Sequence, residues 1–164
     1  MIYLLDSNIF IAAKNEYYAF DICPGFWQWL KTCEELHSTR SVYDEITHGT
    51  DDLSEWIKVF EKEKPAFFVQ PSMEIQKEYA NILWTLYQNN RYSTDAINGF
   101  SNVADSWIVA TAKCCGGVIV TNEKADPNCR KRVKIPDAAA CFGLQCISIF
   151  DVMRDCSVRL TLGQ

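Results

Sequence analysis

Two short apolar runs, one at the start of the chain and one late in it, each lead directly into polar and acidic residues. The first run, 2–5, ends at Asp6, and the second, 118–121, is closely followed by Glu123. Such a run, bounded by a polar turn, is typical of a strand buried on both faces of a sheet. The order is a strand, a long helix and a second strand, and an acid follows the carboxyl end of each strand. This order predicts an α/β fold with parallel strands and right-handed crossovers.

The position of Asp6 admits two interpretations. Open α/β sheets place their active-site crevices at the carboxyl ends of the strands, where Asp6 is expected to lie. Aspartate is also a common N-cap, and Ser7 and Asn8 are good N-cap residues for a helix through about Ala13. The first stretch alone leaves both interpretations open.

Length and composition favour one folded domain over residues 1–164. Hydrophobic residues make up 48% of the chain and aromatic residues 13%, which argues against disorder. No apolar run approaches the roughly 20 residues that cross a bilayer, and no basic segment precedes the first apolar run. We therefore expect a cytoplasmic protein without a membrane partner.

The chain has eight cysteines and two histidines. No C-x-x-C pair occurs, which argues against a zinc site, and thiols stay reduced in the cytosol. We therefore expect free cysteines. His48 follows a predicted short helix, where neutralising the helix C-terminus is a better interpretation than a role as metal ligand.

Periodicity and turn residues predict further helices and strands. Several segments carry apolar residues at i, i+3, i+4 and i+7, the spacing of one helical face. We expect helices over 24–37, from Ser41, over 51–62, 71–89, 103–112, 136–142 and 150–156, one helical turn from Thr94, an aromatic-rich loop over 15–23, and short strands at 67–69, 133–135 and 146–149.

Two further acids lie at helical positions with apolar neighbours. Glu45 falls on the inward face of the helix that begins near Ser41, or at the edge of that face. Asp105 falls in the first turn of the helix 103–112, after Asn102 as a possible cap, where the helix dipole alone favours a carboxylate. The functional interpretation is that these acids point into the crevice of Asp6.

Carboxylates gathered in one crevice need a counter-charge. They repel one another and raise one another's pKa, and hard divalent cations relieve that repulsion. Magnesium and manganese prefer carboxylate oxygens and suit in-line displacement at phosphorus. The sequence offers four candidate ligands at matched places of an α/β pattern: Asp6, Glu45, Asp105 and Glu123.

A basic segment follows the second strand in a chain whose net charge is −5. The acidic balance argues weakly against a nucleic-acid partner, although bound divalent ions would offset it. The basic segment is either a solvated loop or a rim that contacts RNA phosphates. Its residues are Lys124, Arg130, Lys131, Arg132 and Lys134.

Four segments resemble the motifs of PIN-domain nucleases. Residues 4–11 look like the opening motif, and 104–112 look like the central acidic helix. Residues 118–123 are similar to the last motif, a strand leading to Thr-x-acid, and 41–46 match the second acid on its short helix. Order and spacing agree, and the resemblance covers about residues 2 to 150.

The resemblance implies a Rossmann-like three-layer fold with a central, mainly parallel sheet and helices on both faces. It implies a Mg²⁺- or Mn²⁺-dependent ribonuclease acting on RNA, commonly the toxin of a type II toxin–antitoxin pair with a cognate antitoxin, and often a homodimer. By this resemblance the metal ligands are Asp6, Glu45, Asp105 and Glu123, supported by Ser7, Asn8, Thr121 and Asn122.

One departure from the family pattern leaves alternatives open. The fourth acid is usually Asp, whereas this chain has Glu123, with Asp126 three residues later. Either residue fits the role. The departure also motivates a second hypothesis, a catalytically degenerate PIN-like module that binds RNA or protein. A nucleophilic-aspartate phosphatase is disfavoured, because it needs a second acid where Asn8 stands.

Overall fold

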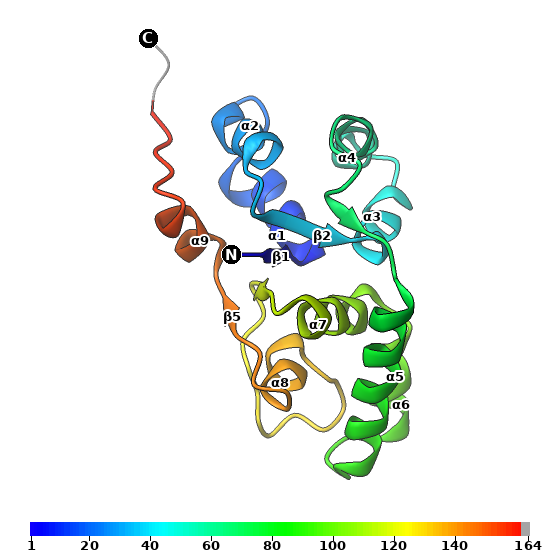
Figure 1. Cartoon of the computed structure of the whole chain (residues 1–164). Coiled ribbons are helices and arrows are strands. Elements are labelled where there is room, and N and C mark those ends of the chain that lie inside the picture. The colour runs from blue at the N-terminus through cyan, green and yellow to red at the C-terminus, as the bar shows by residue number, and fades with distance from the viewer. Residues whose placement is uncertain (162–164) are drawn as a thin grey trace.

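The computed structural model describes residues 1–161 and contains the predicted parallel sheet. Its strands follow the order β3-β2-β1-β4-β5, and each neighbouring pair is parallel. Helices cover both faces, so the α/β prediction is confirmed (Figure 1). The strands are β1 Tyr3–Leu5, β2 Leu36–Thr39, β3 Phe68–Val69, β4 Val118–Val120 and β5 Cys146–Ile147.

The helices form two layers, each with its own hydrophobic core. In Figure 1, α2 and α4 lie above the strands, whereas α5, α7 and α8 lie below them. The elements are α1 Ser7–Ala12, the π-helix η1 Ala13–Tyr17, α2 Pro24–Thr32, α3 Arg40–Thr47, α4 Asp52–Glu63, α5 Met73–Gln88, α6 Thr94–Ser101, α7 Ala104–Cys115, α8 Ile135–Ala140 and α9 Ile149–Asp155.

The two apolar runs pair as the centre of the sheet. Leu5 lies opposite Val120 in the parallel register of β1 and β4, and neither side chain is exposed. The Asp6 N–H continues this pairing by donating to the Val120 carbonyl at 3.0 Å. Burial on both faces explains why these strands read as continuous apolar runs.

The strand β2 overturns the prediction of a helix through His37. Helix α2 ends at Thr32, and Cys33 is already extended. Leu36 is fully buried, and the Ser38 hydroxyl donates to the Leu5 carbonyl at 2.7 Å. Pairing with both β1 and β3 stabilises the extended backbone here, although the local sequence carries a helical pattern.

Two helix starts were placed at the wrong residue. Helix α3 begins at Arg40, not at Ser41, because the Thr39 hydroxyl caps it by accepting the Val42 N–H at 3.3 Å. Helix α7 follows Val103, which makes no side-chain cap, so Asn102 is not the cap.

Three irregular segments also differ from the prediction. Residues 133–135 form no strand, because Ile135 opens α8. The helical turn expected at Thr94 is the two-turn helix α6, and the first part of the loop expected over 15–23 belongs to η1. Short irregular segments have weak periodicity, so contacts with the rest of the fold decide their conformation.

The starts of two helices and the free cysteines agree with the prediction. Helices α4 and α5 begin after Asp51 and Ser72, whose side chains accept backbone N–H groups of the first turn. All eight cysteines are free. Among the helices of residues 1–161, none is long and apolar enough to span a membrane.

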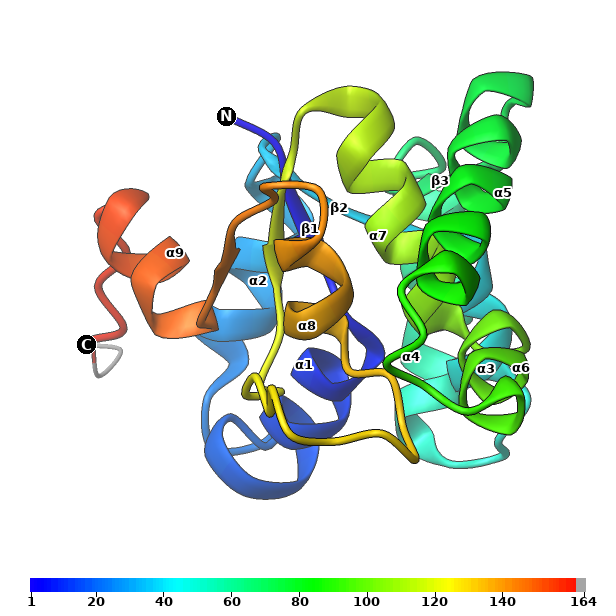
Figure 2. The same ribbon diagram turned by 90° about the horizontal axis from the view of Figure 1, so that it is seen from below.

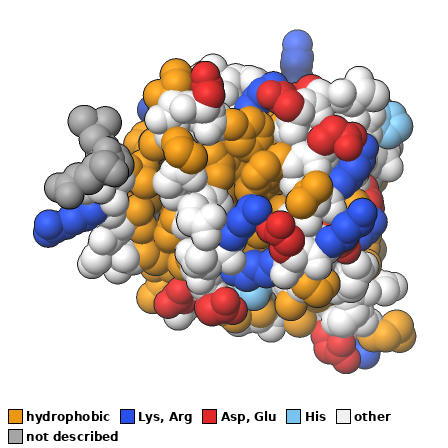
Figure 3. Space-filling view, turned by 90° about the horizontal axis from the view of Figure 1, so that it is seen from above, with side chains coloured by type: hydrophobic (Ala, Val, Ile, Leu, Met, Phe, Trp, Pro, Cys, Tyr) orange, Lys and Arg blue, Asp and Glu red, His pale blue; other side chains and the backbone are white. Residues whose placement is uncertain are grey.

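One face of the molecule gathers hydrophobic side chains. Figure 3 shows them as a band on the side that carries α2 and α4. Ile22, before α2, is 80% exposed, and Val59 of α4 is 52% exposed. Trp29 of α2 and Trp56 of α4 are partly buried. This face is a different surface from the strand ends that hold the candidate acids.

Candidate metal centre

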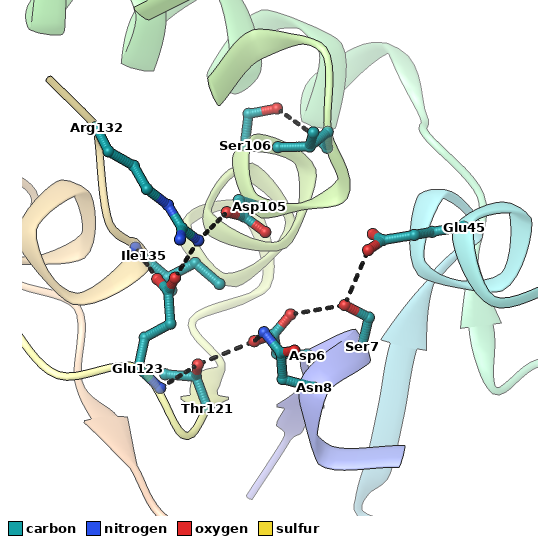
Figure 4. A network of polar contacts seen from close by, with 11 residues as sticks. Asp6, Ser7, Asn8, Glu45, Asp105, Ser106, Thr121, Glu123, Arg132 and Ile135 are labelled. Atoms are coloured by element: carbon teal, nitrogen blue, oxygen red, sulfur yellow. Dashed lines mark hydrogen bonds and ion pairs between the residues drawn. The ribbon is translucent and has the colours of Figure 1, made fainter. Parts of the chain in front are cut away.

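The predicted acids converge at the carboxyl ends of β1 and β4. Asp6 follows β1, Glu123 follows β4, and Asp105 lies in the first turn of α7. Glu45, on α3, approaches from the other side of Asp6 (Figure 4). Figure 2 shows the loop from β4 running below α1 toward α6 before it returns to α8.

Asp6 is held by side chains and does not cap the helix. It occupies the N-cap position of α1, but its carboxylate makes no capping hydrogen bond. Instead, this fully buried carboxylate accepts hydrogen bonds from Thr121 Oγ1 at 3.0 Å, Asn8 Nδ2 at 3.4 Å and Ser7 Oγ at 3.4 Å. The capping interpretation therefore does not explain Asp6, and the predicted supporting residues Ser7, Asn8 and Thr121 are its partners.

The carboxylates are close enough to perturb one another. Burial raises the pKa of Asp6, and the charge of Glu123 raises it further, against the hydrogen bond from Thr121. Burial, followed by the charges of Asp6, Glu123 and Glu45, raises the pKa of Asp105 to about 7. This crowding of negative charge is the electrostatic condition that a divalent cation relieves.

Glu45 lies at the edge of its helix face rather than inside the core. The residue is exposed, whereas Val42 and Ile46 on the same face are buried. Its Oε1 accepts a hydrogen bond from Ser7 Oγ at 3.3 Å. Burial of the carboxyl and the charge of Asp6 raise its pKa. Ser7 therefore contacts both Asp6 and Glu45.

Glu123 holds the basic loop against the centre. Its Oε1 accepts a hydrogen bond from Arg132 Nη2 at 2.5 Å, and its Oε2 accepts the Ile135 N–H at 2.8 Å. Its own N–H donates to Thr121 Oγ1 at 3.1 Å. The Arg132 guanidinium also lies 4.0 Å from Asp105. Both carboxylate oxygens of Glu123 are therefore engaged by the returning loop.

Asp126 belongs to a separate network on the same loop. Its N–H donates to Asp137 Oδ2 at 2.9 Å, and Arg91 bridges the Asp126 carbonyl at 2.8 Å and Asp137 Oδ1 at 3.2 Å. Its carboxylate lies 4.0 Å from Lys134. The structure thus places Glu123, not Asp126, beside Asp105. Sequence reasoning missed Arg91 and Asp137, because no local pattern links two residues so far apart in the chain.

The basic residues border two cavities beside the acids. Lys131 and Arg132 line a cavity of about 440 Å³ together with Glu45 and Asp105. Lys124 lines a larger cavity of about 870 Å³, together with Thr121, Asn122 and Glu123. Arg130 is exposed on the same loop. A contact between these cations and phosphates stays a prediction.

The donor atoms suit a hard divalent cation, but they are not yet gathered around one point. Within residues 1–161, no group of three His, Cys, Asp or Glu side chains could hold a metal ion as it stands. The crowded carboxylate oxygens and the raised pKa of Asp105 fit magnesium or manganese chemistry. His48 ends α3 and is exposed.

Comparison with known protein families assigns the chain to one of them. Residues 3–160 match the family described as "Domain of unknown function (DUF4411)". The chain belongs to this family. No curated protein matches the DUF4411 chain significantly.

Solved structures identify the fold. The DUF4411 chain matches a chain of VapBC2 from Rickettsia felis, bound to a DNA fragment from its promoter, with 16% identity and a TM-score of 0.57. It matches VapBC-1 from nontypeable Haemophilus influenzae with 20% identity and a TM-score of 0.55. Each match covers 90% of this chain and 98% of the other. VapC is a PIN-domain toxin, so the predicted PIN-like fold is confirmed.

Proposed function

We propose that this protein is a divalent-metal-dependent endoribonuclease and the toxin of a type II toxin–antitoxin pair. The observation that carries the proposal is the convergence of Asp6, Asp105 and Glu45 at the strand ends of a PIN-like fold, where the charge of Asp6 raises the pKa of both Asp105 and Glu45. Carboxylates so close together are costly without a counter-charge. A function that binds a cation there accounts for the arrangement.

In this proposal each residue has a distinct role. A bound Mg²⁺ or Mn²⁺ would lower the pKa of an attacking water and stabilise the leaving oxygen. Asp6, Glu45 and Asp105 would hold the ion, and Thr121 and Asn8 keep the Asp6 carboxylate in one orientation. Glu123 stays the predicted fourth ligand, a role in which it would exchange its contact with Arg132.

The proposed substrate is RNA, and the basic loop would contact it. The exposed Lys124 and Lys131 line the cavities beside the acids and would receive phosphates while the scissile bond lies over Asp6, and Arg130 is exposed on the same loop. Arg132 would join them when it leaves Glu123. Binding to these side chains should weaken with salt, because it releases counterions from RNA.

An antitoxin partner, a homodimer and a cytoplasmic location complete the proposal. The likeness to VapBC chains supports an antitoxin, and the hydrophobic face over α2 and α4 offers a surface for a protein contact. A short neighbouring reading frame whose product binds and neutralises the protein would support the toxin assignment. Growth inhibition that such a product does not relieve would contradict it.

RNA cleavage by substituted proteins tests the catalytic proposal. We expect Mg²⁺- or Mn²⁺-dependent cleavage of single-stranded RNA by the wild type, and a rate lower by about 10³-fold for Asp6→Asn or Asp105→Asn. Asp21→Asn is the matched control, because Asp21 is an exposed aspartate before α2. Cleavage that survives both site substitutions at the control's rate would refute the proposal.

One observation favours a second candidate, the catalytically degenerate binding module. Both carboxylate oxygens of Glu123 already have partners, Arg132 and the Ile135 N–H. A module without a working metal site would keep this arrangement permanently. Calorimetric titration with Mn²⁺ separates the two candidates. The nuclease should bind Mn²⁺ in a manner that Asp6→Asn abolishes, whereas the degenerate module should show no Asp6-dependent binding.

A further inference from the structure

The function proposed above uses only the inner end of a groove next to the acids, where Lys124 would contact a phosphate. The groove is the cavity of about 870 Å³ enclosed by α1, η1, the turn after β4, β5 and the start of α9. Asn8 lines this groove and also the smaller cavity that contains Glu45 and Asp105. The two cavities therefore adjoin at Asn8, which donates a hydrogen bond to Asp6. A chain-like ligand lying over Asp6 would continue into the groove.

Two exposed rings form the far wall of this groove. Tyr17, at the end of η1, is 54% exposed, and Phe150, in the first turn of α9, is 41% exposed. Their centroids are 6.0 Å apart at an interplanar angle of 79°. We name this pair the aromatic corner. An edge-to-face pair leaves ring faces available to a third planar group.

The aromatic corner rests on a rigid support. Behind it, Tyr18 stacks on the fully buried Phe26, with centroids 4.4 Å apart and planes at 11°. The Tyr18 carbonyl accepts a hydrogen bond from Trp27 Nε1 at 2.6 Å. The backbone that presents Tyr17 is thus fixed from within the core. A preformed aromatic surface loses little side-chain entropy on binding.

The backbone of η1 is itself unusual. Ala13–Tyr17 form a π-helix, and the Tyr18 N–H donates to the Ala13 carbonyl at 2.6 Å. Such segments are rare in proteins and occur frequently at functional sites. The wider turn ends the helix beside α9, where Tyr17 meets Phe150. It therefore builds the aromatic corner from two elements far apart in the sequence.

The polar lining suits bases better than a row of phosphates. Lys124, at the end nearest the acids, is the groove's cation, while Glu16 and Asp151 lie on the aromatic side. The Asp151 carboxylate already accepts hydrogen bonds from Ser148 and Arg154. Phosphates are therefore favoured only near Lys124. Farther along, planar groups that stack and carry hydrogen-bond donors are favoured.

We propose that the groove is a nucleobase-stacking subsite for single-stranded RNA, in which bases next to the cleavage position stack on Tyr17 and Phe150. The inference rests on the proposed function, since it takes the acids as the place where the strand is cut. Bases in a duplex hide their faces within the stack, so the subsite selects unpaired RNA. The continuity of the groove with Asp6 through Asn8, and Lys124 at its inner end, favour RNA over a protein segment.

Binding of short RNA tests the subsite without cleavage. The protein carries Asp6→Asn and is kept in EDTA, and the probe is a fluorescein-labelled 12-nucleotide oligouridine followed by anisotropy. Tyr17→Ala should weaken binding about tenfold, the loss typical of one stacked base. Phe150→Ala should weaken it severalfold. Tyr17→Phe, which keeps the ring, should bind as the parent does.

Matched controls separate stacking from other causes. Trp84→Ala removes a ring that is 65% exposed on α5 and should leave binding unchanged. An abasic oligonucleotide of the same length should bind weakly and be insensitive to Tyr17→Ala. Equal losses for oligouridine and the abasic probe would overturn the inference, because they would mean that only the backbone is recognised. Circular dichroism of each variant excludes misfolding as the reason for a loss.

The outcomes also show whether a protein segment occupies the groove instead of RNA, and they separate a failure of this inference from a failure of the proposed nuclease function. If Tyr17→Ala alters sedimentation or the capture of an antitoxin peptide but not RNA affinity, the groove is a protein interface and the inference is wrong. Failure of metal-dependent cleavage by the wild type refutes the nuclease. Base-dependent binding that requires Tyr17 would then remain as a property of a binding module.

Discussion

Asp6 and Glu123 look alike in the sequence and differ in the structure. Each follows a short buried strand, and β1 and β4 are neighbours in the sheet. Asp6 is fully buried, and hydroxyl and amide groups of Thr121, Ser7 and Asn8 hold it. Glu123 is instead paired with a guanidinium and a backbone amide of the loop that returns to α8.

The difference shows how one loop changes the character of a carboxylate. Neutral donors orient Asp6 and leave its charge uncompensated, so a cation is favoured nearby. Arg132 compensates Glu123 within the chain, and the Ile135 N–H fixes its second oxygen. Asp6 is therefore the stronger candidate for a metal ligand. Glu123, as placed, joins the loop to the centre.

The largest expected effect compares the two acids directly. Asp6→Asn should lower the Mg²⁺-dependent rate of RNA cleavage by about 10³-fold, equivalent to several kcal/mol of lost metal-dependent stabilisation. Glu123→Gln should lower it only about tenfold, because Arg132 already compensates the charge of Glu123 and makes it the weaker of the two proposed ligands. Single-turnover cleavage measures both. Equal losses would make the two acids equivalent ligands and remove the distinction.

The charges of Asp6 and Glu123 both raise the pKa of Asp105, so the effect of Asp105 on the free energy of unfolding should depend on pH. Its pKa of about 7 in the folded protein exceeds the ordinary value of 3.8. As pH rises between these values, the carboxyl loses its proton in the unfolded chain while it is still protonated in the folded protein. The free energy of unfolding therefore falls over this range, and the destabilisation is complete above pH 7. Asp105→Asn should therefore raise the free energy of unfolding at pH 8 in EDTA by about 2 kcal/mol, within the ceiling of about 4 kcal/mol that the shift sets.

Chemical denaturation at two pH values measures this gain. At pH 4 it should largely disappear, because Asp105 is then protonated in the folded state and the pH lies close to the ordinary value of 3.8 that applies to the unfolded chain. The gain in unfolding free energy from Asp105→Asn should be smaller in a protein that also carries Asp6→Asn than in one that also carries Glu123→Gln. The reason is that Asp6 contributes more than Glu123 to the raised pKa of Asp105. A gain of the same size at both pH values would contradict the assignment.

Thr121 connects the two acids and should matter mainly to Asp6. Its hydroxyl donates to Asp6 and accepts the Glu123 N–H. Thr121→Val removes the donor, and the affinity for Mn²⁺ should fall about tenfold, as for other groups that orient metal ligands. Thr121→Ser keeps the hydroxyl and should bind nearly as the wild type does. Calorimetry with Mn²⁺ measures both, and equal affinities for Val and Ser would show that the hydrogen bond is unimportant.

The smallest expected effect is the coupling between Glu123 and Arg132. The Arg132 side chain is 64% exposed, so solvent screens the pair. A double-mutant cycle with Glu123→Gln and Arg132→Gln should give a coupling free energy of about 0.5 kcal/mol. This value should fall in 1 M salt (roughly 3 Å screening length). A coupling that salt leaves unchanged would show that the contact is packing rather than an ion pair.

Local pattern alone predicted the strands that carry the site. Residues of β1 and β4 are apolar on both faces, and this signal needs no knowledge of neighbours. The pattern failed at β2, because three of the four residues of Leu36–Thr39 are polar and the segment follows a helical stripe. Only hydrogen bonding to β1 and β3 makes that segment a strand.

The sequence by itself determined the parallel sheet and placed Asp6 and Glu123 at one edge of it. It did so because buried parallel strands read as apolar runs, and the residues that follow them meet at their carboxyl ends. Tertiary structure alone decided the partner of each carboxylate. Thr121 reaches Asp6 across 115 positions of the chain, and Arg132 reaches Glu123 through the return of a loop. Hydrogen-bond partners are chosen by proximity in space, which a linear pattern does not contain.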